Sequence, residues 1–299
     1  MTSRELARKV ADAVLYEGYM LYPYRHSALK NQERWSFGIL YPPAYEEVQG
    51  GTERSIMHSE CLLETAEETG APKMQLELRF LQPGPREAVT ERFMNFGIEL
   101  SQDSELVPFS FLASDCQQVD GSICIRQQKI GNGLMKVTSE VRNESAFPGP
   151  KTCDRDLALE YSMLSAHTIL EIQNGRFISL LDPPKHLSDV VSRCKNIGNF
   201  PVLVGNEGER SLMLCSPIVL YDYPQIAPES AGDFYDATEM DEMLTLRVMT
   251  LTDEEKSEMR AADARVRQML ERTEQTAREQ LIKTHGSFRD LKPGRAKSA

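Results

Sequence analysis

The chain has 299 residues, of which 40% are hydrophobic and 26% charged, and this composition excludes a small scaffold held together by disulfides. Its 34 basic and 45 acidic residues give a formal net charge of −11. A negative charge of this size excludes broad, non-specific binding to nucleic acid or to an anionic membrane. We therefore expect no nucleic-acid partner.

The first ten residues are charged and lack the apolar region and cleavage site of a secretory signal. No apolar run approaches the ~18 to 20 residues that a membrane-spanning helix needs. The 6 cysteines contain no Cys-x-x-Cys pair and lack the spacing of a zinc or iron-sulfur site. We expect a cytoplasmic protein with free thiols and no membrane span, and no cofactor is implied by a motif.

Short structured segments follow one another from the N-terminus. Residues 3–15 place four apolar side chains at helical spacing, namely Leu6, Val10, Ala13 and Val14, which predicts a short amphipathic helix. Runs rich in β-branched or aromatic residues follow, separated by proline and glycine. They cover residues 16–24, 35–41, 55–63, 73–81 and 108–112. These runs predict a meandering antiparallel sheet.

A β-hairpin is the clearest local feature of the sequence. Residues 122–130 and 134–141 flank Gly131-Asn132-Gly133, and glycine and asparagine supply the positive φ angles that hairpin turns require. The alternating pattern predicts one buried face made of Ile123, Ile125, Val137 and Val141. Further strands are predicted at 163–172, 176–181, 201–204 and 212–221.

The C-terminal region has a helical pattern. Thr252 and Glu255 form a capping box, and apolar residues then recur at steps of three and four from Met259 to Ala277. This pattern predicts one amphipathic helix of about seven turns.

Together these segments predict an α+β protein that is mainly β. Its body is an antiparallel β-sandwich-like structure, with a short N-terminal helix and a C-terminal amphipathic helix. We divide the chain into a β-rich N-terminal region, a second β-rich region that either shares the first core or has its own, a helical segment and a basic flexible tail. These parts are residues 1–150, 151–235, 236–285 and 286–299.

The signatures of the commonest enzyme classes are missing from the sequence. It has no phosphate-binding P-loop, no Gly-x-Ser-x-Gly elbow, no His-Glu-x-x-His and no dinucleotide fingerprint. This observation favours a non-catalytic protein, and an enzyme whose site is assembled from distant residues stays the alternative, because such a site leaves no local pattern.

The most unusual segment is acidic, with ten acidic and two basic residues between positions 229 and 258. The acidic residues at its start are Glu229, Asp233, Asp236, Glu239, Asp241 and Glu242. In the simplest interpretation they lie in solvent at the positive end of a helix. Two alternatives remain open: an interaction surface for a basic partner, or a cation site that uses Asp233, Asp236 and Glu239, which are spaced three apart.

Two histidines have acidic or thiol neighbours. His167 and Glu171 are four residues apart, so on a strand they share a face without touching, which favours a core histidine over a catalytic base or metal ligand. His167 remains a weak metal candidate beside the acidic segment. His58 and Cys61 are three residues apart, and strand alternation places them on opposite faces.

Several stretches of the sequence resemble those of one bacterial protein family. They are VADAVLYEGYMLYPYR at 10–25, RWSFG at 34–38, LLDPP at 180–184, PVLVG at 201–205, SPIVLYDYPQIAPES at 216–230 and EMDEMLTLR at 239–247. This family is associated with gene clusters of high-affinity, actinobacterial-type nickel-iron hydrogenases, and the resemblance extends along nearly the whole chain.

The resemblance implies an accessory role for the hydrogenase, such as assembly, maturation or stabilisation, with hydrogenase subunits or maturation factors as protein partners. It carries over no catalytic residue. Two alternatives stay open: a metal-binding protein or hydrolase-like enzyme that uses the carboxylates of 229–242 with a histidine, and a structural homo-oligomer.

Overall fold

The structure is a computed structural model that describes most of the chain. The described residues are 1–18, 24, 37–65, 70–84, 89–100, 104–112, 118–131, 133–149, 154–225, 247–262 and 264–285. For residues 262 and 276–285 only the backbone is described. Residues 1–17 and 35–226 form one compact unit, and residues 18–34 and 227–299 belong to a second. The predicted basic tail at 286–299 lies outside the described residues.

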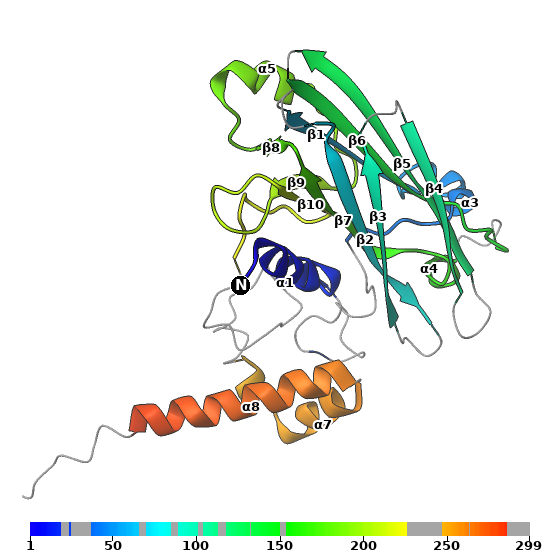
Figure 1. The fold of residues 1–299 in the computed structure, drawn as a ribbon. Coiled ribbons are helices and arrows are strands. Elements are labelled where there is room, and N and C mark those ends of the chain that lie inside the picture. Colours follow the sequence, from blue (N-terminus) through cyan, green and yellow to red (C-terminus); the bar gives the residue numbers. More distant parts are fainter. Residues whose placement is uncertain are drawn as a thin grey trace, which may run out of the picture. The chain divides into compact units, whose positions relative to one another are not determined.

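The described strands of the first unit form two antiparallel five-stranded sheets (Figure 1). The first sheet has the order β4 (Ser104–Leu112), β5 (Gln118–Gly131), β6 (Leu134–Asn143), β1 (Ile56–Glu64) and β8 (Arg176–Ile178). The second sheet has the order β3 (Val89–Glu99), β2 (Lys73–Pro83), β7 (Leu164–Gln173), β10 (Leu212–Ser216) and β9 (Phe200–Leu203). Each sheet combines strands from before and after residue 150. The mainly β, α+β fold predicted from the sequence is therefore confirmed.

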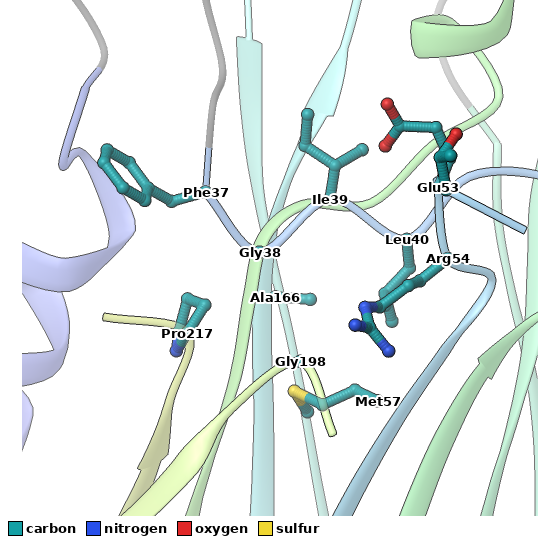
Figure 2. A pocket seen from close by; sticks show the side chains of 11 residues that line it. Phe37, Gly38, Ile39, Leu40, Glu53, Arg54, Met57, Ala166, Gly198 and Pro217 are labelled. Atoms are coloured by element: carbon teal, nitrogen blue, oxygen red, sulfur yellow. The ribbon is translucent and has the colours of Figure 1, made fainter. Parts of the chain in front are cut away.

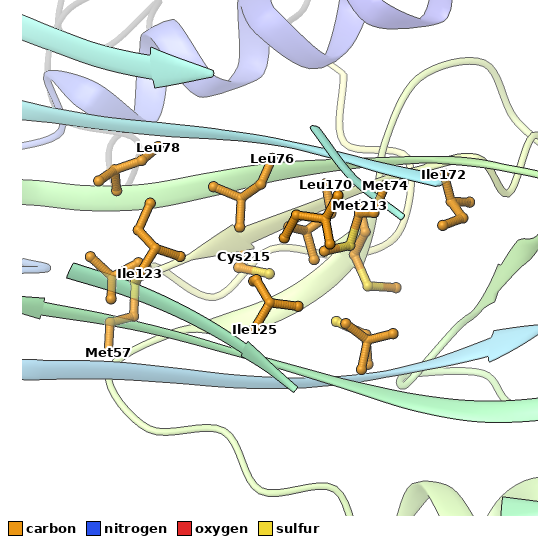
Figure 3. Close-up of a cluster of buried hydrophobic side chains, with 14 of the residues drawn as sticks. Met57, Met74, Leu76, Leu78, Ile123, Ile125, Leu170, Ile172, Met213 and Cys215 are labelled. Carbon is orange, nitrogen blue, oxygen red and sulfur yellow. The ribbon is translucent and has the colours of Figure 1, made fainter. Parts of the chain in front are cut away.

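The inward-facing side chains of both sheets form one hydrophobic core. Figure 3 shows Ile123 and Ile125 of β5 in the same layer as Leu76 and Leu78 of β2 and Leu170 of β7. All four residues of the predicted buried hairpin face are at most 2% exposed. The predicted hairpin is confirmed, because β5 and β6 pair antiparallel from Gly121 with Asn143 to Gly131 with Leu134.

The helix α1 (Ser3–Leu15) packs against the outer face of the second sheet. It confirms the predicted N-terminal helix. A capping box stabilises its start, because Thr2 Oγ1 accepts a hydrogen bond from the Glu5 backbone and Glu5 Oε2 accepts one from the Thr2 backbone. Its apolar stripe of Ala7, Val10, Ala11 and Val14 lies against Ile169, Val202, Val204, Leu212 and Leu214.

Short helices close other parts of the sandwich. The helix α3 (Pro43–Val48) and the helix α4 (Arg155–Leu159) contribute to a cluster that contains Tyr41, Tyr45 and Phe147. The 3-10 helix η3 (Lys185–Leu187) and the helix α5 (Ser188–Val191) supply Leu187, Val190 and Val191, which pack against Leu62 of β1 and Ile178 of β8.

Some predicted strands differ from the observed ones. The run 16–24 is not a strand at its start, because residues 16–18 form a turn, and 19–23 lie outside the described residues. In the run 35–41 the described part forms one isolated bridge, between Leu40 and Met163. The run 212–221 ends as a strand at Ser216, because Pro217 lacks the N–H that a ladder needs.

In the second unit the prediction of a single C-terminal helix is wrong. The chain forms α7 (Asp253–Ala262) and α8 (Ala264–His285). Lys256 Nζ lies 3.7 Å from Glu274 Oε1, although 18 residues along one straight helix would span about 27 Å. The two helices therefore fold back on each other and bury Met259, Val266, Met269 and Leu270.

The predicted capping box at the start of α7 is present. The Glu255 backbone donates to Thr252 Oγ1 over 3.2 Å, and the Thr252 backbone donates to Glu255 Oε2 over 2.9 Å. Over the residues described here, neither this helix nor any other combines the length and apolarity that crossing a bilayer requires.

Candidate functional site

A cavity of about 250 Å³ opens at one end of the sandwich (Figure 2). Its walls come from the segment before α3, the loop that leads into β1, the start of β7, the loop before β9 and the residue after β10. The lining side chains are apolar at Phe37, Ile39, Leu40, Met57, Ala166 and Pro217, and polar at Thr52, Glu53 and Arg54, with glycine at 38 and 198. Leu40, Met57 and Ala166 are almost fully buried, so the surface that the cavity offers comes largely from polar atoms.

Backbone hydrogen bonds hold the polar rim in place. The Tyr41 backbone donates to the Arg54 carbonyl over 2.7 Å, and the Ser55 backbone donates to Glu46 Oε2 over 2.9 Å. Both bonds tie the loop around Arg54 to the α3 region, so the loop that precedes β1 has a fixed backbone at Arg54.

A glycine shapes the opposite wall. Gly38 has a φ of +59°, and a Cβ at this position would lie 2.6 Å from Pro217 Cγ. Any other residue at 38 would therefore collide with Pro217 in addition to adopting a strained backbone. The close approach of the two segments depends on this glycine.

The charges at the rim point in different directions. In Figure 2 the Arg54 guanidinium lies on the side of Ala166 and Met57, whereas the Glu53 carboxylate lies on the side of Ile39. Within the described ranges, no carboxylate lies within ion-pair distance of Arg54. Arg54 is exposed, so its guanidinium lies at the mouth of the cavity beside solvent.

A second group of charged residues lies on the outer face of the first sheet. Glu140 accepts hydrogen bonds from Arg126 over 2.6 Å and from Arg142 over 2.7 Å, and its Oε1 lies 3.0 Å from His58 Nδ1. Burial raises the pKa of Glu140, but the bonds from Arg142, Arg126 and His58 outweigh burial and lower it to about 2. These contacts satisfy the carboxylate, so the group stabilises the sheet.

The predicted separation of His58 and Cys61 is observed. His58 faces outward, with Nε2 at 3.8 Å from Glu60 Oε1, whereas Cys61 belongs to the hydrophobic core. A hydrogen bond with Cys215 and burial both raise the pKa of the Cys61 thiol, so it stays protonated. Four described cysteines are free thiols: Cys61 and Cys215 are buried, and Cys124 and Cys194 are half-buried. The other two, Cys116 and Cys153, lie outside the described residues.

His167 is a core residue with no exposed surface. Its Nδ1 donates to the Ser165 carbonyl over 2.7 Å, whereas Nε2 has no partner. Burial lowers the pKa of His167 to about 3, against a smaller opposing effect of the Ser165 bond. Glu171 instead forms an ion pair with Arg4 at 3.1 Å, so these two residues do not form a catalytic pair.

Glu229, Asp233, Asp236, Glu239, Asp241 and Glu242 all lie outside the described residues, so an interaction surface or cation site there stays a prediction. Elsewhere, in the part of the chain that the structure describes, no group of three or more His, Cys, Asp or Glu side chains is arranged to hold a metal ion.

The cavity was not predicted from the sequence. Its lining residues extend from Phe37 to Pro217, and no local spacing connects them. The sequence offers only weak signals, such as Gly198 in a loop and Pro217 at the end of a strand. The unpaired state of Arg54 depends on the folded arrangement and leaves no mark in the sequence.

Comparison with protein-family models, with curated proteins and with solved structures finds no match to this chain.

Proposed function

We propose that this chain is a non-catalytic accessory protein of a nickel-iron hydrogenase system and acts in the cytoplasm through protein-protein contacts. The observation that supports the proposal is the sequence resemblance, which is carried by stretches such as residues 10–25 and 216–230. The role would be assembly, maturation or stabilisation of the hydrogenase.

The acidic residues at 229–242 are the proposed contact surface. Their charge would steer a basic partner, and such attraction weakens as salt screens it. A partner bound through this surface should therefore dissociate more readily at high ionic strength.

The test is purification of the lightly tagged protein from its own host, with bound proteins identified by mass spectrometry at low and at high salt. We expect hydrogenase subunits or maturation factors at low salt and their loss at high salt. The variant Asp233→Asn/Asp236→Asn/Glu239→Gln should retain much less partner. A matched control is Asp182→Asn/Asp189→Asn/Glu99→Gln, which removes the same charge at exposed positions of the sandwich and should bind normally.

Recovery of the tagged protein alone, under every salt condition, would contradict the proposal. The metal-binding alternative then predicts stoichiometric divalent metal in the purified protein, and the homo-oligomer alternative predicts a defined assembly in solution. Equal partner recovery by both triple variants would reject the acidic surface while leaving the accessory role in place.

A further inference from the structure

We propose that the edge strand β3 pairs with the β3 of a second copy of this chain, antiparallel about a two-fold axis at Phe93. This surface does not depend on the hydrogenase association. All of β3 belongs to the first compact unit, and none of it lies in the acidic segment at 229–242. A dimer formed through β3 is compatible with the accessory role and does not require it.

The described sheets end in four edge strands, and three of these edges are protected (Figure 1). An open edge offers a row of N–H and C=O groups to any other strand, so folded proteins shorten it, cover it or interrupt it with proline. The strand β8 has only 3 residues, and β4 has Pro108 at its centre. Along β9, the Tyr223 backbone donates to the Leu203 carbonyl over 2.7 Å, and the Leu203 backbone donates to Asp222 Oδ1 over 2.8 Å.

The fourth edge strand, β3, has none of these protections. It has 11 residues and no proline. It pairs with β2 from Val89 to Glu99 without a register shift, so its other edge is continuous. Within the described residues, the backbone bonds of the stretch 93–99 all lead to β2. The outward N–H and C=O groups of this stretch are therefore available to another strand.

Phe93 supplies an apolar contact at the middle of this edge. It is 64% exposed, although folded proteins mostly bury phenylalanine. It lies on the face of the sheet that it shares with Glu91 and Asn95, two positions away on either side. Cross-strand aromatic pairs stabilise antiparallel sheets. A strand that places an aromatic ring opposite Phe93 would therefore remove this side chain from water.

A second copy of β3 supplies such a strand. When two copies pair about a two-fold axis at Phe93, each Phe93 ring lies opposite the other. Glu91 then lies opposite Asn95, whose amide can donate a hydrogen bond to the carboxylate. The edge is thus complementary to itself in this register.

Other registers of the same pairing are less favourable. An axis at Arg92 sets two arginines opposite each other, and an axis two residues away from Phe93 in either direction sets two glutamates opposite each other. Like charges that lie directly opposite destabilise a sheet. An axis at Met94 sets Phe93 against the polar Asn95. Charge and aromatic burial together therefore favour the axis at Phe93.

The contact between the copies is narrow. Residues 89–97 of one copy face those of the other over about 30 Å of strand, at about 3.4 Å per residue. This strip lies at the low end of interface sizes, below about 1,200 Å² in total. We therefore expect a dissociation constant on the order of 10 to 100 μM, with β3 a free edge in more dilute solution.

Sedimentation equilibrium of the full chain between about 1 and 300 μM tests the pairing. We expect an equilibrium between monomer and dimer. Phe93→Lys places a charge on the edge and should weaken the dimer by about tenfold or more, with an unchanged melting temperature. The matched control is Leu106→Lys on β4. Leu106 is also 64% exposed but lies on a protected edge, so this variant should dimerise normally.

Hydrogen exchange locates the interface. Amides of β3 should exchange more slowly at high protein concentration than at low concentration, whereas those of β4 should exchange at the same rate at both. A chain that stays monomeric over the whole range would overturn the proposal, as would a dimer that Phe93→Lys leaves intact or that both variants weaken equally. Protection of β3 only when a different protein binds would assign the edge to a strand of that protein, which also contradicts the self-pairing.

Discussion

The outer faces of the two sheets are stabilised in different ways. The second sheet is covered by α1, whose apolar stripe buries Ile169 and Leu214. The first sheet instead carries Arg126 and Arg142, whose side chains are 45% and 41% exposed, paired with Glu140. The face under α1 is closed mainly by hydrophobic packing, with ion pairs such as Arg8 with Glu77 beside it. The face of the first sheet is covered at Leu62 by η3 and α5 and keeps its arginines in contact with water.

This difference determines which polar groups each face accommodates. Beneath α1, burial lowers the pKa of His167 to about 3, and the charge of Arg79 acts in the same direction, so the ring is neutral. On the open face, Glu140 is ionised because three donors surround it. Substitutions should therefore have large effects under α1 and small effects on the open face.

The largest effect is expected beneath α1. Ala11 is 0% exposed, so Ala11→Glu places a charge against the second sheet and should reduce the free energy of unfolding by about 3 kcal/mol. The measurement is urea-induced unfolding. The same change at half-buried Ala13 should cost less than about 1 kcal/mol, and equal losses at both positions would refute the packing of α1.

A pH-dependent effect is expected at His167. The histidine has a pKa of about 3 in the folded protein against its ordinary value of 6.5, so acidification protonates the unfolded chain first. Stability should therefore fall as pH drops below about 6.5, by up to about 1.4 kcal/mol per pH unit.

Unfolding curves between about pH 5 and pH 7 isolate this effect from that of Glu140. The pKa of Glu140 lies below this range both in the unfolded chain, at 4.5, and in the folded protein. In His167→Gln the dependence on pH in this window should be clearly shallower. An unchanged slope would mean that His167 is accessible to protons in the folded state.

A smaller effect is expected from Glu140→Gln on the open face. The variant should lose about 1 kcal/mol at neutral pH. The folded pKa of Glu140, about 2, lies below 4.5, so its contribution is complete above pH 4.5 and is lost as pH falls through about 2. The difference between wild type and variant, measured by chemical unfolding across this range, should vanish at the acid end.

The smallest effect is expected from Arg126→Gln. Its side chain is 45% exposed, so solvent screens the pair with Glu140 and the loss should stay below about 0.5 kcal/mol. A loss as large as that of Ala11→Glu, in the same unfolding assay, would show that the first sheet also depends on a buried network.

Strands with a regular pattern were predictable from the sequence, because alternation and turn chemistry are local. The β5–β6 hairpin shows this, since Gly131 and Gly133 flank its turn and Ile123 and Val137 mark its buried face. The strand β3 was missed. As an edge strand it carries Thr90, Glu91 and Arg92, and this polar run hides its alternation.

Features that depend on distant contacts were not predictable. Buried residues recur at steps of three and four from Met259 to Thr273 because each helix buries one side against the other. This periodicity alone does not reveal where α7 ends and α8 begins. The cavity at Arg54 has the same origin. Its residues meet only after the two sheets pack together.

Hydrogen exchange of backbone amides tests most directly whether α1 closes the second sheet as part of one cooperative sandwich. The account predicts that amides of β2, β7 and the buried face of α1 exchange only when the whole sandwich unfolds, whereas those of the edge strands β3 and β4 exchange faster through local opening. Rapid exchange of the α1 amides while β7 stays protected would contradict it.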